Sequence, residues 1–184
     1  MMERVAVMDR PRAMPSRIRG SIAGVLAVLV LVLVAGPSAQ AAPSKTPITD
    51  DVTAFRSTVI KELDEFMATY GPRLSAGERA QLDGVETTMT SQLSALIQAT
   101  SRAERLAASG ASRSSRMTAA ANAVRVHAEG MAAAQKSLAE VQPVIQPHLS
   151  FFEALSAKST FDRQMSTYQG LGTQLQAFQA RQRR

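Results

Sequence analysis

The sequence predicts an all-helical (all-α) protein, folded as an elongated antiparallel bundle of about four helices, three of them long. Apolar residues recur every three or four positions along most of the chain after residue 48, which is the spacing of one helix face. No stretch of useful length alternates apolar and polar residues as a half-buried strand would, and aromatic residues make up only 4% of the chain. Two Ser-x-x-Glu sequences also stand where new helices would begin, as in a capping box.

The first 41 residues are expected to be an export signal rather than part of the bundle. Residues 22–35 are apolar throughout, and the small-residue sequence Ala39-x-Ala41 follows them. The segment just before the apolar run is basic, with Arg12, Arg17 and Arg19. A basic region, a short apolar run and a small-residue cleavage site are the layout of a secretory signal peptide. The run of 14 residues is shorter than the roughly 20 that span a bilayer.

We expect cleavage after Ala41, with Ala42 as the second candidate, and a periplasmic or extracellular destination, since the same signal serves both. An N-terminal anchor that stays uncleaved is the main alternative. The basic segment before the apolar run is unusually long, so Met14 is an alternative start of translation.

The charge and the cysteine content exclude several classes of function. The whole chain carries a net charge of +6, but residues 1–41 hold five Lys or Arg and two Asp or Glu, so residues 42–184 carry +3. This modest excess predicts no nucleic-acid partner. Because the chain has no cysteine, disulfides, thiolate metal sites and a cysteine nucleophile are excluded. The mature chain is long enough to be stabilised by a hydrophobic core instead.

One helical domain is predicted over residues 49–184, after a flexible leader at 42–48 that is rich in proline and small polar residues. The first helix begins with Asp50 and Asp51, whose negative charge complements the helix dipole, and it ends at Gly71-Pro72. Its apolar face consists of Val52, Phe55, Val59, Leu63, Phe66 and Tyr70.

The second helix is expected to begin at a capping box formed by Ser75 and Glu78. Its apolar face consists of Leu82, Val85, Met89, Leu93, Leu96, Ile97, Ala103 and Leu106. Small polar residues at 108–115 then predict a loop.

The third helix is predicted to run from about residue 116 to residue 141 and to end before Pro143 and Pro147. Its apolar stripe consists of Met117, Ala121, Val124, Ala128, Met131, Leu138 and Val141. Alanine dominates this helix, so a neighbouring helix can approach its backbone closely.

The fourth helix is predicted to open with a second capping box, formed by Ser150 and Glu153. Its apolar positions are Leu155, Met165, Tyr168, Leu171, Leu175 and Phe178. The polar stretch at 156–160 is a candidate bend. Because a helix of about 30 residues is about 45 Å long, we expect an elongated, coiled-coil-like shape whose leftover apolar surface a homodimer would bury.

We predict that the protein is not an enzyme and holds no cofactor. The chain has no Gly-x-Ser-x-Gly motif, and Gly170-Leu171-Gly172 lies in a helical pattern, without the preceding strand that a nucleotide fingerprint requires. The carboxylates Glu62, Asp64 and Glu65 are expected on a solvated helix face, because nothing in this polar stretch would separate two pKa values as a catalytic pair requires.

His127 and Met131 are the candidate metal ligands. They lie four residues apart, so a helix would place both on one face, and imidazole and thioether ligands suit copper. Two ligands do not complete a coordination shell, so we favour the interpretation in which both residues pack at the core and no metal binds. His148, which follows Pro147, is expected in a surface turn.

The C-terminus is the candidate segment for binding an anionic surface. Its arginines are Arg181, Arg183 and Arg184. Positive charge there complements the helix dipole, and a frayed tail is the simpler interpretation. In the functional interpretation, the arginines contact a membrane or a cell-wall polymer, and Leu171, Leu175 and Phe178 form the apolar side of an interfacial helix.

The two capping boxes share a longer pattern that resembles a known family. Leu74-Ser75-Ala76-Gly77-Glu78 and Leu149-Ser150-Phe151-Phe152-Glu153 are both Leu-Ser-x-x-Glu. This doubled motif is similar to the Leu-Thr-x-x-Gln signature of the periplasmic Spy/CpxP-like family, although Ser and Glu replace Thr and Gln. The resemblance implies a cradle-shaped dimer that shields unfolded client proteins.

We therefore expect an exported, non-enzymatic protein that works by protein binding in the cell envelope, as a holdase-like chaperone or an interaction module. The alternative is an envelope- or membrane-associated structural protein that uses the basic, amphipathic C-terminal helix.

Overall fold

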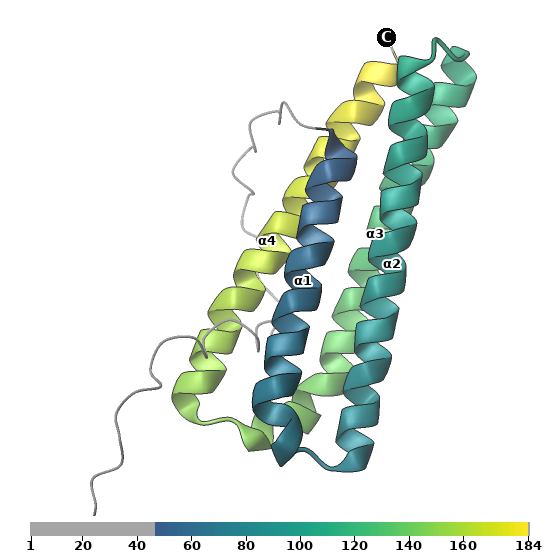
Figure 1. The fold of residues 1–184 in the computed structure, drawn as a ribbon. Helices are drawn as coiled ribbons and strands as arrows, with labels where there is room; N and C mark the ends of the chain where they lie inside the picture. Colours follow the sequence, from purple (N-terminus) through teal and green to yellow (C-terminus); the bar gives the residue numbers. More distant parts are fainter. Residues whose placement is uncertain (1–46, 184) are drawn as a thin grey trace, which may run out of the picture.

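The computed structural model describes residues 47–183, which form four helices in one antiparallel bundle (Figure 1). The helices are α1 (Ile48–Tyr70), α2 (Ala76–Ala108), α3 (Arg113–Ile145) and α4 (Phe151–Gln182). Short 3-10 helices, η2 (Gly71–Arg73) and η3 (Gln146–His148), connect α1 to α2 and α3 to α4. The predicted all-helical class and the three long helices are confirmed. The predicted signal at 1–41 lies outside the described residues.

The hydrophobic core runs along the inside of the bundle, and α1 supplies it as its sequence pattern predicts. All six predicted apolar positions of α1 are buried, together with Ile48. On α2, Leu82, Val85, Leu93, Leu96 and Ala103 are buried as expected, while Met89 and Ile97 pack at the edge of the core. None of the described helices is both long enough and apolar enough to cross a membrane.

The predicted apolar stripe of α3 is wrong in its first half. Ala121 and Ala128 are exposed, and the buried face consists of Ala119, Ala120, Ala123, Val126 and His127. Alanine occurs on every side of this part of the helix, so the spacing of apolar residues does not select one face. The neighbouring helix decides instead, because α2 and α3 have the most extensive contact in the bundle.

The predicted ends of α3 are also wrong. The loop before α3 spans only residues 109–112, because Ser112 accepts a hydrogen bond from the backbone N–H of Ser115 and so caps the helix early. At the other end, α3 continues through Pro143 to Ile145. A proline so close to the C-terminus of a helix removes a single backbone hydrogen bond, and the burial of Val141 and Ile145 offsets that loss.

Helix α4 runs without a break through residues 156–160, where a bend was a candidate. Ala157 and Thr160 are buried there, so this polar stretch faces the core on one side. Leu155, in contrast, was predicted to be a core residue and is 58% exposed.

The two ends of the bundle are built differently. Both 3-10 turns lie at one end, and the α2–α3 turn lies at the other end beside the C-terminus of α4 (Figure 1). The start of α1 also lies at that second end, since α1 runs antiparallel to α2.

Candidate functional site

A buried polar contact joins α3 to α4 through His127 and Tyr168. The Nε2 atom of His127 lies 2.8 Å from the main-chain oxygen of Tyr168, and the Tyr168 hydroxyl donates to the main-chain oxygen of His127 at 3.4 Å. The two rings stack with their centroids 4.4 Å apart, and Phe55 of α1 stacks on Tyr168 at 5.4 Å. Because a carbonyl oxygen only accepts, Nε2 must carry a proton. Burial lowers the pKa of His127, which favours the neutral ring.

Two glycines make room for this pair. A Cβ atom at Gly130 of α3 would collide with the Tyr168 hydroxyl, and a Cβ atom at Gly172 of α4 would collide with the His127 ring. Each helix therefore carries a glycine opposite the ring of the other helix. This explains Gly172 in the Gly-Leu-Gly sequence as a packing residue.

The metal candidates lie at the core. His127 is buried and Met131 packs half-buried against the core cluster. One ring nitrogen of His127 is already hydrogen-bonded to Tyr168. Within residues 47–183, no group of three or more histidine, aspartate or glutamate side chains is placed to hold a metal ion.

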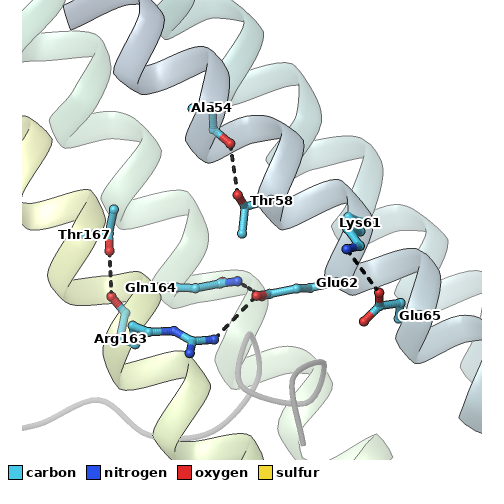
Figure 2. Close-up of polar contacts among 8 residues, drawn as sticks. All are labelled: Ala54, Thr58, Lys61, Glu62, Glu65, Arg163, Gln164 and Thr167. Atoms are coloured by element: carbon cyan, nitrogen blue, oxygen red, sulfur yellow. Dashed lines mark hydrogen bonds and ion pairs between the residues drawn. The ribbon is translucent and has the colours of Figure 1, made fainter. Parts of the chain in front are cut away.

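Glu62 is a half-buried ion-pair partner rather than a solvated surface residue. Its side chain is only 12% exposed, and it lies 3.6 Å from the guanidinium of Arg163 on α4. Gln164, also on α4, donates a hydrogen bond to the same carboxylate (Figure 2). Burial raises the pKa of Glu62, and the Arg163 charge opposes that rise. The expectation of a solvated face for Glu62 was wrong, whereas Glu65 pairs with Lys61 on the exposed side of α1.

The signal for the position of Glu62 was present in the sequence. Glu62 lies three residues after Val59 and four before Phe66, and both of these are core residues of α1. Helical geometry therefore places the Glu62 side chain at the edge of the core. The ion pair with Arg163 and the hydrogen bond from Gln164 tie α1 to α4.

A small internal cavity lies close to these residues. Its volume is about 30 Å³, and its polar lining includes Gln92, Ser137, Gln164 and Tyr168. A space of this size has room for about one or two water molecules.

The turns before α2 and α4 have the same construction, and we call them the first and second proline turns (residues 71–78 and 146–153). Each contains a 3-10 turn with proline second, then a basic residue, a leucine and a capping box. In the first box, the Ser75 N–H donates to Glu78 at 2.7 Å and the Glu78 N–H donates to the Ser75 hydroxyl at 3.3 Å. Ser150 and Glu153 form the second box with the same two distances. Both predicted capping boxes are confirmed.

The two proline turns hold each other through their basic residues. His148 of the second turn lies 3.0 Å from the carboxylate of Glu78 in the first. Arg73 of the first turn lies 4.0 Å from the carboxylate of Glu153 in the second, and the Tyr70 hydroxyl donates to Glu153 at 3.2 Å. Each capping glutamate therefore holds its own helix start and receives a group from the other turn. His148 lies in a turn, as expected, and is half-buried by this contact.

These contacts shift the acidity of the groups involved. The hydrogen bond from His148, followed by those from Ser75, lowers the pKa of Glu78 to about 2. Hydrogen bonds from Ser150 lower the pKa of Glu153. Burial, followed by the Glu153 charge, raises the pKa of Tyr70 to about 12. Both glutamates are therefore ionised at neutral pH and Tyr70 is protonated.

Three large apolar side chains project from the second proline turn and the first turns of α4. Phe151 is 77% exposed, Phe152 is 79% exposed and Leu155 is 58% exposed. The two phenylalanine rings make an edge-to-face contact, with centroids 5.7 Å apart. We call these three residues the phenylalanine patch.

The sequence interpretation missed this patch, although a signal for it existed. Phe151 and Phe152 are consecutive at the very start of α4, and adjacent helical residues point about 100° apart. Two large rings in these directions are harder to bury together than rings three or four residues apart, so this pair at a helix start favours exposure.

The C-terminal candidates are divided between the core and the surface. Leu171 and Leu175 are buried in the bundle and Phe178 is half-buried against the core. An interfacial role for the apolar side of α4 would thus require α4 to leave the bundle. Arg181 and Arg183 are exposed at the opposite end from the phenylalanine patch, and Arg184 lies outside the described residues.

No protein-family model, no curated protein and no solved structure matches this chain.

Proposed function

We propose that the protein is an exported, non-enzymatic binding protein of the cell envelope, and that it contacts its protein partner with the phenylalanine patch. The observation that supports this proposal is the exposure of Phe151, Phe152 and Leu155 on a molecule whose other large apolar side chains, within the described residues, are buried or half-buried. Contiguous exposed apolar residues on a folded protein are typical of sites of interaction.

The position of the patch suits binding. The rings belong to the first turns of α4, whose start is held by Ser150 and Glu153. A rigid helix start restricts the rings before a partner arrives, so little conformational entropy is lost on binding. Aromatic side chains also dominate the binding energy of many protein interfaces.

The size of the patch indicates what kind of contact it makes. Stable interfaces bury about 800 Å² on each partner, and three side chains supply well under that area. The patch therefore suits an extended apolar segment or a small pocket of a partner better than a broad, permanent interface. A holdase that captures unfolded segments and a module that inserts its rings into one dedicated partner both fit this description.

The test compares the chain from Ala42 with a Phe151→Ser/Phe152→Ser variant. Both are mixed with an unfolded client, and light scattering follows aggregation at near-stoichiometric ratios. In parallel, each tagged protein is used to capture partners from its native envelope fraction. The matched control is Gln169→Ser/Gln176→Ser, which alters two exposed positions farther along α4.

A holdase suppresses aggregation, and the patch variant loses that activity while the control keeps it. A dedicated module captures one or two stoichiometric partners, and the patch variant loses them. If the unaltered chain does neither, or if the patch variant behaves like the control, the proposed function is wrong.

A further inference from the structure

The charged residues are distributed unequally along the bundle. The half that contains the α2–α3 turn and the end of α4 (residues 47–58, 93–129 and 167–183) has eight arginines and four carboxylates, a net charge of +4. The half that contains the proline turns (residues 59–92 and 130–166) has six Lys or Arg and nine carboxylates, a net charge of −3. The two halves together give a net charge of +1 for residues 47–183, so this part of the chain is nearly neutral in sum and strongly polarised along its axis.

The positive half ends in a group of six arginines, which we call the arginine end. Its members are Arg102, Arg105, Arg113, Arg116, Arg181 and Arg183. The fold brings them together from the end of α2, the start of α3 and the end of α4 (Figure 1). Arg113 donates to the main-chain oxygen of Arg183, which joins the α2–α3 turn to the C-terminal turn of α4.

Five of these six arginines are exposed to solvent, and Arg116 is half-buried with its Nε atom inside the protein. Within residues 47–183, none of the six is in an ion pair, whereas most cations of the negative half are paired. The nearby carboxylates are Asp50, Asp51 and Glu104, and Glu104 already accepts hydrogen bonds from the N–H of Ile48 and the hydroxyl of Thr49. Two helices begin and two helices end here, so their dipoles offset one another. The arginines therefore determine the electrostatic potential at this end of the bundle.

The chemistry of the arginine end favours phosphate. Every cation in the positive half is arginine and none is lysine, and the planar guanidinium fork matches phosphate oxygens in a bidentate geometry. Arg102 and Arg105 also line an open hollow between α2 and α3, opposite Asn122 and Val126. That hollow has room for a phosphate group beside the two guanidinium groups.

We infer that the arginine end docks end-on against the phosphate headgroups of an anionic lipid bilayer. The charge of this end complements such a surface. The exposed large apolar side chains of the described residues all lie at the opposite end, so the contact is with headgroups rather than acyl chains.

Docking of this kind sets the orientation of the whole molecule. Helices of 33 residues are about 50 Å long, so the phenylalanine patch is held about that far above the lipid surface. The inference goes beyond the proposed function and does not depend on it, because the two ends use different residues.

The test measures co-sedimentation with lipid vesicles. The chain from Ala42 is used, because residues 22–35 would bind lipid by themselves and because the core lies within the described helices. Circular dichroism first checks that each variant is helical. Vesicles of phosphatidylglycerol with phosphatidylcholine are compared with vesicles of phosphatidylcholine alone, at low and high salt.

We expect binding only to the anionic vesicles and loss of that binding at high salt, since the contact is electrostatic. Arg102→Gln/Arg105→Gln/Arg181→Gln should weaken binding about a hundredfold, because each arginine near an anionic surface contributes roughly fivefold. The matched control, Arg79→Gln/Lys136→Gln/Lys158→Gln, removes the same charge from the other half and should bind within about threefold of the unaltered chain, since those residues would lie beyond the screening distance.

Three results would overturn the inference. The first is that the unaltered chain does not bind anionic vesicles. The second is that both triple variants bind equally weakly, which would mean that the net charge of the protein, rather than one end of it, determines binding. The third is binding to soluble polyphosphate without binding to vesicles, which would assign the arginine end to a soluble anionic polymer. The Phe151→Ser/Phe152→Ser variant should bind vesicles normally, so failure of either proposal is distinguishable from failure of the other.

Discussion

The two proline turns have nearly the same backbone and quite different surfaces. Both place proline in a 3-10 turn and close a capping box with identical hydrogen-bond lengths. Between the serine and the glutamate, the first box has Ala76 and Gly77, and the second has Phe151 and Phe152. The comparison teaches that a capping box constrains its first and last residues and leaves the two between them free to vary in size and polarity.

The turns also differ in the basic residue with which each contacts the capping glutamate of the other. Arg73 lies 4.0 Å from Glu153 and over the ring of Tyr70, whereas His148 makes a closer hydrogen bond of 3.0 Å with Glu78. The second box therefore receives a permanent charge and a tyrosine hydroxyl, and the first receives a titratable ring.

The largest effect is expected when the phenylalanines are moved from the second turn to the first. The variant Ala76→Phe/Gly77→Phe/Phe151→Ala/Phe152→Gly keeps both capping boxes and relocates the rings to α2. A dedicated partner should then bind about thirtyfold more weakly or worse, the effect of losing one hot-spot contact of about 2 kcal/mol. A holdase, which tolerates varied geometry, should retain most of its suppression of aggregation. Calorimetric titration measures the affinity for a dedicated partner, and light scattering measures the suppression of aggregation by a holdase.

The relocation has its own control. Phe151 and Phe152 are exposed, so moving them should leave the midpoint of thermal unfolding nearly unchanged. A large fall in that midpoint would mean that the rings stabilise the fold, and the comparison between the two turns would then fail.

A smaller effect is expected from removing the capping serines. Ser75→Ala and Ser150→Ala each remove the acceptor for one backbone N–H, which should lower the free energy of unfolding by about 1 kcal/mol, with a range of roughly 0.5–2 kcal/mol. Urea unfolding followed by circular dichroism measures both. Because the two boxes have the same geometry, we expect equal losses, and a difference of more than about 1 kcal/mol would show that the turns are not equivalent.

The smallest effect is expected in acid. Glu78 has a folded-state pKa of about 2, which is below the value of about 4.3 for an unfolded glutamate. Its contribution to stability is therefore present above about pH 4.3 and is lost as the pH falls through about 2. Glu78→Gln should therefore flatten the dependence of unfolding on pH within this window. Thermal unfolding at several pH values between about 5 and 2 checks this. Glu153 has a lowered pKa as well, so Glu153→Gln should act with the same sign. Unchanged pH dependence in both variants would contradict the pairing of the turns.

The elements that could be predicted from the sequence are those with strong local signals. The apolar stripe of α1 is regular, and its buried residues match the prediction. The face of α3 was predicted wrongly, because Ala119 and Ala123 are buried while Ala121 and Ala128 are not, and all four have the same side chain. The spacing of Glu62 places it beside the core residues of α1, but its charge predicts exposure to solvent. Its burial depends on Arg163 of α4, which the sequence pattern does not place beside it.

The sequence by itself determined the helical class, the two capping boxes and the absence of disulfide chemistry, because each depends on residues within a few positions or on composition alone. Only the tertiary structure decided that His148 meets Glu78 and Arg73 meets Glu153, across 70 and 80 residues of chain. It also decided that Phe151 and Phe152 stay exposed while Leu171 and Leu175 are buried. Helix geometry specifies which side chains share a face, but the rotation of each helix in the bundle depends on how all four pack together.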